Sequence, residues 1–408
     1  MSNSNTTSDM APFTIRSFEN IEPWAAYDDL REQGPLVWDD VLKGWVVLDY
    51  DNCAYIEINE DKFRNAYVGV PPIIVQVKGG RSNITLTSGD EHMRMRRFLM
   101  RLFTPPLLEA YRERHIRPII AMLIDRFQNR GTADLCAELG DQIPPRVIAA
   151  LLGLEWQDDH LIERILDLHE KIMAFLGTKF SDPAMMEKAL ETSKSINDIL
   201  LPNIRRTREQ RGDDLISRIW SEAPAEYGEM DEETVIGICR ELFLGGADTT
   251  VHGIANSLYL MLTQPELRAA ITADRKAALS AHVEEAMRLY GSVMYRFRVA
   301  NTDCVIAGRE VKANQLLILL HSAANRDPAH FGCPHHADLS RKPVDHLAFN
   351  KGPRSCIGIG LARFEMRDTL DAVLDRLPNV RLDPTAEQPG FKSLFMRSWR
   401  PLHVRFDA

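Results

Sequence analysis

Apolar residues recur three and four positions apart along most of the chain, a spacing that predicts amphipathic helices. The stretches with this period are 107–127, 157–175, 183–208, 234–262 and 282–289. Two short runs, 45–48 and 315–320, consist largely of Val, Leu and Ile and predict strands. Residues 328–353 are rich in Pro and His and predict an irregular connection. The pattern therefore predicts a mainly α-helical fold with a small β-rich region.

Nothing in the sequence marks a domain boundary. The length of 408 residues alone suggests two or three domains. However, the chain has no linker-like stretch, no low-complexity tract and no internal repeat. Residues 1–10 are polar and are expected to form a disordered N-terminal tail.

Charge and cysteine usage exclude some classes of protein. The net charge of -9 gives no support for nucleic-acid binding. The six cysteines show no C-x-x-C pair and no framework spacing, which is typical of free thiols in a reducing cytosol. We find no signal peptide and no apolar run long enough to cross a membrane, so we expect a cytoplasmic protein without a membrane anchor.

Cys356 ends a loop shaped by Gly and Pro, in the segment FNKGPRSCIG at 349–358. Residues 357–376 repeat apolar side chains at helical spacing, so the sulfur is expected at a helix N-terminus, where a thiolate is favoured. Gly352 and Gly358 leave room for a flat partner to approach the backbone. A lone thiolate beside such a partner suits a haem iron. An isolated cysteine, by contrast, is usually buried and inert.

The segment ELFLGGADTT at 241–250 interrupts a long apolar helix with two adjacent glycines. One interpretation is that a helix stops at Gly245-Gly246 and another is N-capped by Asp248 or Thr249. The other is one long helix, locally opened into a groove. Glu241 stands four residues before Gly245, so in a continuous helix both face the same groove.

Basic residues cluster in HMRMR at 92–96. His92 and Arg96 are four apart and share one helix face, while Arg94, Arg97 and Arg101 lie on roughly the opposite face. Glu285 and Arg288 form an i,i+3 pair that, taken alone, is a surface ion pair of small effect.

Taken together, these motifs resemble those of the cytochromes P-450, the haem-thiolate monooxygenases, in their soluble bacterial form. The loop matches the family's Phe-x-x-Gly-x-Arg-x-Cys-x-Gly pattern, and the resemblance covers about 23–406. It implies the all-α P-450 fold as a single domain over 11–408, with haem b (iron protoporphyrin IX) as cofactor. The sequence departs from the soluble bacterial pattern at Asn350, where Gly is usual, and at Arg354, where His is frequent.

The resemblance also assigns roles. Cys356 is the axial iron ligand, and Asp248 and Thr249 deliver protons during oxygen activation. The expected haem contacts are Phe349, Gly358, His92, Arg96, Arg298 and Arg354. Glu285 and Arg288 are structural, with Arg341 a candidate third partner. The expected pocket walls are residues 66–85, Glu241, Leu244, Gly245, Met294, Leu394 and Phe395.

The implied activity is insertion of one oxygen atom from O2 into a small or mid-sized, mostly hydrophobic substrate, terpenoid-like or aromatic. The chain has no ferredoxin cysteine set and no convincing dinucleotide fingerprint, so electrons are expected from a ferredoxin and an NAD(P)H-dependent reductase. We expect a monomer. Two alternatives stay open, a non-catalytic haem-thiolate sensor and a peroxide-driven oxygenase.

Overall fold

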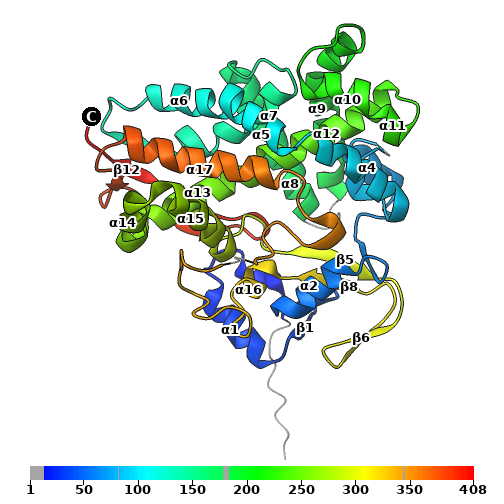
Figure 1. Ribbon diagram of the computed structural model, residues 1–408. Helices are drawn as coiled ribbons and strands as arrows, with labels where there is room; N and C mark the ends of the chain where they lie inside the picture. The colour runs from blue at the N-terminus through cyan, green and yellow to red at the C-terminus, as the bar shows by residue number, and fades with distance from the viewer. Residues whose placement is uncertain (1–12, 81, 178–182, 343–344) are drawn as a thin grey trace, which may run out of the picture.

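The computed structural model describes residues 13–80, 82–177, 183–342 and 345–408 (Figure 1). The predicted disordered tail therefore lies outside the described residues. The helices are α1 (Trp24–Glu32), α2 (Tyr50–Ile58), α3 (Pro72–Val77), α4 (Gly89–Arg101), α5 (Pro105–Tyr111), α6 (Arg117–Asp125), α7 (Ile143–Leu151), α8 (Asp159–Gly177), α9 (Pro183–Glu209), α10 (Leu215–Glu222), α11 (Pro224–Tyr227), α12 (Glu232–Ala247), α13 (Thr249–Thr263), α14 (Pro265–Ala273), α15 (Arg275–Leu289), α16 (His321–Ala324) and α17 (Ile359–Arg376).

The strands are short and form small sheets. They are β1 (Leu36–Asp39), β2 (Gly44–Val47), β3 (Phe63–Asn65), β4 (Thr132–Asp134), β5 (Arg296–Ala300), β6 (Cys304–Ile306), β7 (Arg309–Val311), β8 (Leu316–Leu319), β9 (Arg381–Leu382), β10 (Gly390–Lys392), β11 (Ser398–Arg400) and β12 (His403–Arg405). The largest sheet has the order β1-β2-β8-β5-β3, in which only β2 and β8 run parallel. Figure 1 shows this sheet, with α1, α2 and α16, below the helical part.

The predicted fold class is confirmed, since long helices dominate and the strands gather in small sheets. The runs 45–48 and 315–320 are found as β2 and β8. The predicted helix 107–127 is divided into α5, a π-helical turn at Arg112–Ile116 and α6. Pro118 lies in the first turn of α6, and because it has no N–H it cannot continue a regular α-helical ladder.

The helical core forms around α13. This helix packs against α15 and α17, and its neighbour α12 packs against α7 and α9. Ile254 and Leu258 of α13 have almost no exposed surface. A Cβ on Gly253 would stand 2.8 Å from the Met366 sulfur, so a glycine here permits close approach of α13 and α17. The cysteine segment before α17 is thereby brought opposite α12 and α13. No helix in the described ranges is both long and apolar enough to span a lipid bilayer.

Candidate active site

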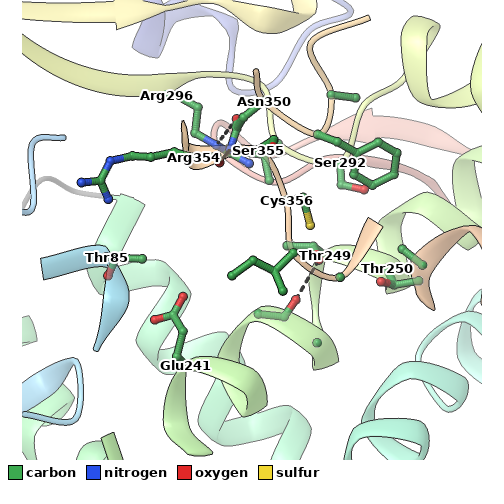
Figure 2. Close-up of a pocket in the computed structure, with 18 of the residues that line it drawn as sticks. Thr85, Glu241, Thr249, Thr250, Ser292, Arg296, Asn350, Arg354, Ser355 and Cys356 are labelled. Atoms are coloured by element: carbon green, nitrogen blue, oxygen red, sulfur yellow. Dashed lines mark hydrogen bonds between the residues drawn. The ribbon is translucent and has the colours of Figure 1, made fainter. Parts of the chain in front are cut away.

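A cavity separates residues 349–358, here called the cysteine loop, from the junction of α12 and α13 (Figure 2). Segments far apart in the sequence contribute to its wall, among them α4, α7, β5, α17 and residues 395–396. Of the six cysteines, all within the described part of the chain, Cys356 lines the cavity and the other five do not. Tertiary packing therefore assembles the cavity around this one sulfur.

Local backbone geometry fixes Cys356. Its N–H donates to the Phe349 carbonyl at 2.8 Å, which closes the loop. Asn350 and Gly352 have φ values of 57° and 66°, a region that Asn and Gly enter at low cost. A Cβ on Gly352 would lie 3.0 Å from Ile58 Cα, so glycine also permits the loop to pack on α2. The sulfur is consequently held in the cavity wall (Figure 2).

Opposing electrostatic effects act on this sulfur. The helix α17 begins at Ile359, two residues later than predicted. Burial raises the pKa of the Cys356 thiol, while the Gly358 N–H and the Arg296 and Arg96 guanidiniums lower it. Burial has the larger effect, so the pKa of the free thiol lies above its ordinary value.

His92 and Arg96 lie on one face of α4 and both line the cavity. The Arg96 guanidinium donates to the Ser355 carbonyl and hydroxyl, each at 2.7 Å. His92 Nδ1 has no hydrogen-bond partner among the described residues and stands 4.0 Å from Glu60 Oε2. Burial and the neighbouring Arg354 lower the pKa of His92 to about 4, so its imidazole is neutral near pH 7.

Arg298 and Arg354 also line the cavity, but each already holds a carboxylate. Arg298 Nη2 lies 3.4 Å from Oε1 of the buried Glu57. Arg354 Nε donates to Glu60 Oε1 at 2.9 Å, and its Nη2 donates to the Thr87 carbonyl at 2.6 Å. Figure 2 shows Arg354 extended away from Cys356. Both guanidiniums are thus charge-matched by the protein itself.

The opposite face of α4 meets α11. Arg97 and Arg101 each lie 3.2 Å from a carboxylate oxygen of Glu226, and Arg94 donates to the Glu226 carbonyl at 3.2 Å. These guanidiniums lower the pKa of Glu226, although burial opposes them. The predicted basic face is therefore present but partly neutralised by one carboxylate.

The α12–α13 junction matches neither interpretation of the double glycine completely. The helix α12 continues through Gly245 and Gly246 to Ala247, and α13 begins at Thr249. Asp248 alone separates them, with φ -110° and ψ -42°, and its side chain caps neither helix. Thr249 Oγ1 donates to the Gly245 carbonyl at 3.1 Å (Figure 2). The helix is thus opened at a single residue, beside the cavity.

Asp248 lies behind this opening and not in the cavity lining. Its Oδ1 is 3.7 Å from His252 Nε2, and His252 Nδ1 is 2.9 Å from Ser398 Oγ. Burial raises the pKa of Asp248, although the neighbouring His252 opposes this. Burial also lowers the pKa of His252. Ser398, His252 and Asp248 therefore lie in a row that ends at the residue next to Thr249.

Glu241 points into the cavity from α12, one turn before Gly245 (Figure 2). No hydrogen bond or ion pair joins its carboxylate to any residue in the described ranges. The charge of Glu241 acts on buried Lys78, whose Nζ stands 4.4 Å from the Tyr67 ring centre. Burial lowers the pKa of Lys78, and the charge of Glu241 opposes that shift. The wall opposite the cysteine loop thus contains a carboxylate without a direct protein partner.

Several expected pocket residues take other positions. Leu244, Met294 and Leu394 are absent from the lining and pack into the neighbouring apolar clusters. Neighbouring residues line the cavity in their place. They are Glu241 and Gly245 near Leu244, Val293 and Tyr295 beside Met294, and Phe395 and Met396 after Leu394. The reason is side-chain direction, which alternates along extended chain and rotates by about 100° per helical residue. From the expected stretch 66–85, the lining residues are Tyr67, Ile84 and Thr85. Phe349 and Gly358 line the cavity as expected.

The pair Glu285–Arg288 lies away from the cavity and is fully buried, unlike a surface ion pair. Arg288 Nε and Nη2 bind the two carboxylate oxygens at 2.8 and 2.9 Å. Arg341 Nε stands 3.3 Å from Glu285 Oε1, so the three side chains form one cluster. Arg288 also donates to the Asn325 carbonyl at 3.0 Å and the Pro334 carbonyl at 2.7 Å. The cluster thereby ties α15 to the irregular segment that leads to the cysteine loop.

Sequence reasoning missed several polar lining residues, among them Asn65 and Ser292, as well as Glu365 as a site residue and Arg296 as a partner of the cysteine loop. Glu365 Oε2 is buried and has no hydrogen-bond partner in the part of the chain described. Burial raises the pKa of Glu365 well above its ordinary value. A signal existed for Glu365: it follows Leu361 by four residues, so the two side chains share one face of the predicted helix. No local pattern distinguishes Arg296 from Arg298.

The comparisons with known proteins agree with this geometry. The cytochrome P-450 family profile matches residues 45–398. The chain is 29% identical over 394 residues to the cytochrome P-450 monooxygenase PikC of Streptomyces venezuelae, covering 94% of this chain and 91% of that protein. It is 33% identical over 313 residues to the mycinamicin IV hydroxylase/epoxidase of Micromonospora griseorubida, covering 75% and 74%. The crystal structure of CYP109E1 from Bacillus megaterium with testosterone superposes with a TM-score of 0.82 at 23% identity, covering 95% of this chain and 100% of that chain. The chain therefore belongs to the cytochrome P-450 family.

Proposed function

We propose that this P-450 monooxygenase, whose cofactor is haem b, inserts one atom of O2 into a small or mid-sized organic molecule that is mostly hydrophobic, terpenoid-like or aromatic. A ferredoxin and an NAD(P)H-dependent reductase supply the electrons. The observation that carries the proposal is the cavity itself: a cysteine on one wall, an opened helix with a threonine on the other, and mainly apolar side chains between them.

The residues present fit haem b. A Cβ at Gly245 or Gly358 would meet no atom within 4 Å, so both backbones border open space. The lining also contains the unpartnered His92 Nδ1 and the guanidiniums of Arg96 and Arg298. Buried polar atoms without partners are costly, and two haem carboxylates would supply acceptors for them.

In this assignment Cys356 would hold the haem iron through its sulfur, and His92, Arg96, Arg298 and Arg354 would bind the haem carboxylates. When bound, the haem supplies reduction and cleavage of O2, which a thiolate ligand favours by donating electron density. Phe349 and Gly358 line the cavity beside the sulfur and shape the space for the flat ring. The assignment of Arg354 requires that it share its guanidinium with Glu60.

Thr249 and Asp248 have the role of moving protons. Thr249 Oγ1 lies in the cavity lining, where its hydroxyl is held by the Gly245 carbonyl. The raised pKa of Asp248 keeps its carboxyl protonated to higher pH than an exposed aspartate, which suits an acid that passes a proton to Thr249. His252 and Ser398 lie on the far side of Asp248 and can replenish that proton.

Substrate selection falls to the wall opposite the cysteine loop. Tyr67, Ile84, Leu99, Ile148 and Phe395 give it an apolar character. Relatives named for mycinamicin IV and for 6-deoxyerythronolide B, together with the testosterone complex of CYP109E1, are consistent with a mid-sized organic substrate. The unpartnered carboxylate of Glu241 would bind one polar group, a hydroxyl or an amine, on an otherwise hydrophobic molecule.

The experiment supplies the purified haem protein with candidate compounds and records the haem spectral shift that accompanies ligand binding. Compounds that bind are then incubated either with a surrogate ferredoxin, its reductase and NAD(P)H, or with hydrogen peroxide alone. The proposal expects oxygenated product mainly in the first reaction. Product only with peroxide supports a peroxide-driven oxygenase, and binding without product in either reaction supports a sensor.

A further inference from the structure

Arg296 is a cation of the cavity lining that forms no ion pair with a carboxylate among the described residues. It is the first residue of β5, two before Arg298, so both side chains lie on the same face of the strand. Its Nε donates to Asn350 Oδ1 at 3.1 Å and its Nη1 donates to the Tyr295 carbonyl at 3.3 Å. No carboxylate in the described ranges lies within ion-pair distance of Arg296. Its hydrogen-bond partners are therefore neutral oxygen atoms, although the more distant charge of Glu57 also acts on its guanidinium.

Of the other three guanidiniums of the lining, two differ from Arg296 in this respect and one does not. Arg298 is matched by Glu57 and Arg354 by Glu60, whereas Arg96 binds only the neutral oxygens of Ser355. His92 is neutral, because its pKa is lowered to about 4 by burial and by Arg354. Arg96 and Arg296 thus have no carboxylate within ion-pair distance in the described part of the chain. The two carboxylates of haem b would supply one, alongside the contacts from His92, Arg298 and Arg354 proposed above.

Asn350 supports the same assignment. It occupies a left-handed turn, with φ 57°, where a glycine would be less strained. The amide compensates by linking two partners: its Oδ1 accepts from Arg296, and its Nδ2 donates to the Arg354 carbonyl at 3.3 Å. Figure 2 shows Arg296 and Asn350 in contact above Cys356. The side chain at this position therefore joins β5 to the cysteine loop.

We propose that Arg296 binds a carboxylate of haem b and, through Asn350, holds the cysteine loop against it. This inference rests on haem b in the cavity and is independent of the substrate and redox partner proposed above. Arg296 is among the cations whose charge acts on the Cys356 sulfur. Removing its charge weakens retention of the anionic cofactor and lowers the reduction potential of the iron, because a nearby positive charge stabilises the reduced state.

The test compares the haem proteins Arg296→Gln, Arg296→Lys and Asn350→Gly with the wild type, using Arg205→Gln as a control. Arg205 is paired with Glu232 on the surface, so its loss removes one guanidinium away from the cavity. Transfer of haem to an excess of apomyoglobin gives the dissociation rate, and spectroelectrochemical titration gives the potential. Neither readout requires turnover.

Arg296→Gln is expected to lose haem about ten-fold faster and to have a lower potential, as for loss of one charge-assisted hydrogen bond. Arg296→Lys recovers the potential and part of the retention. Asn350→Gly keeps the turn but loses the hydrogen bond to Arg296, so its haem dissociation rate should lie between those of the wild type and Arg296→Gln. Arg205→Gln matches the wild type. If Arg296→Gln does not fold, the haem dissociation rates and reduction potentials of Arg296→Lys and Asn350→Gly still test the proposal.

The alternative partner of Arg296 is a carboxylate on the substrate instead of one on haem b. A second titration therefore compares spectral ligands that carry a carboxylate with their methyl esters. If Arg296→Gln leaves haem dissociation and potential unchanged but selectively weakens binding of the acids, Arg296 is a substrate anchor and the proposal is overturned. Unchanged values in every titration overturn it as well.

Discussion

The two walls of the cavity are built in different ways. The cysteine loop is one contiguous decapeptide whose backbone is closed by the Cys356–Phe349 hydrogen bond and packed through Gly352 onto α2. The opposite wall combines α12, α13, residues 65–85, and Phe395, which meet only in the folded chain. In that wall the Glu241 carboxylate has no direct partner among the described residues.

This difference separates two kinds of function. A loop stabilised by its own hydrogen bonds can present one sulfur in the same position regardless of what the rest of the cavity binds. A wall assembled from distant segments can change its side chains without disturbing that sulfur. We therefore expect substitutions in the cysteine loop to affect the cofactor, and substitutions opposite to affect proton delivery and substrate choice.

Replacing the sulfur gives the largest expected effect. Cys356→Ala should abolish the red-shifted absorption band of the reduced carbon-monoxide complex, because that band requires a thiolate ligand. Cys53→Ala, a buried site, and Cys333→Ala, an exposed one, are the controls and should retain it. If Cys356→Ala kept the band, the assignment of the axial ligand would be wrong.

On the opposite wall, Thr249→Ala should retain haem and substrate but waste NAD(P)H as hydrogen peroxide. Loss of a positioned proton donor should reduce product per NAD(P)H by roughly ten-fold or more. The matched control is Thr263→Ala, whose hydroxyl makes a similar bond to the Tyr259 carbonyl at the far end of α13. Coupling equal to that of the wild type in Thr249→Ala would remove this threonine from proton delivery.

The sequence predicts the cysteine loop better than it predicts the opposite wall. The Cys356 motif is local, so the loop and its neighbouring helix were predictable to within two residues. The i,i+4 spacing of His92 and Arg96 was sufficient to place both on the cavity. Leu244, Met294 and Leu394 were misplaced because side-chain direction there depends on strand register and on packing of distant segments.

The partners of charged groups were the least predictable feature. Glu57 and Glu60 lie on the segment around the end of α2, and nothing in their sequence neighbourhood indicates Arg298 and Arg354 as partners. Burial also raises the pKa of Cys356 by more than the Gly358 N–H lowers it. Pairing and desolvation are properties of the assembled cavity and have no one-dimensional signature.

Glu241→Leu tests substrate choice and should have a smaller effect. Binding of ligands with a hydroxyl or amine should weaken about ten-fold, while purely hydrocarbon analogues bind as before. Glu233→Leu, an exposed carboxylate in the first turn of the same helix, serves as the control. Titrations that follow the haem spectral shift measure both ligand classes. Equal losses for both classes would argue against an anchoring role.

Charge reversal on the outer face of α4 should have the smallest effect. Arg97→Glu or Arg101→Glu should slow ferredoxin-driven turnover by a few-fold and flatten its salt dependence, since both side chains are exposed and screened. Glu226→Gln should have the opposite effect, because it releases both guanidiniums from their carboxylate. Unchanged kinetics at low salt in all three variants would exclude this face as the docking site.

The central claim is that this cavity activates O2 and transfers one of its atoms to a bound substrate. The most direct measurement is turnover of a spectrally identified ligand under ¹⁸O2, with a surrogate ferredoxin, reductase and NAD(P)H, followed by mass spectrometry of the product. The account predicts one labelled oxygen atom per product molecule, and no label when ¹⁸O is supplied as water instead. Product that carries oxygen from water, or that forms equally well without O2, would contradict it.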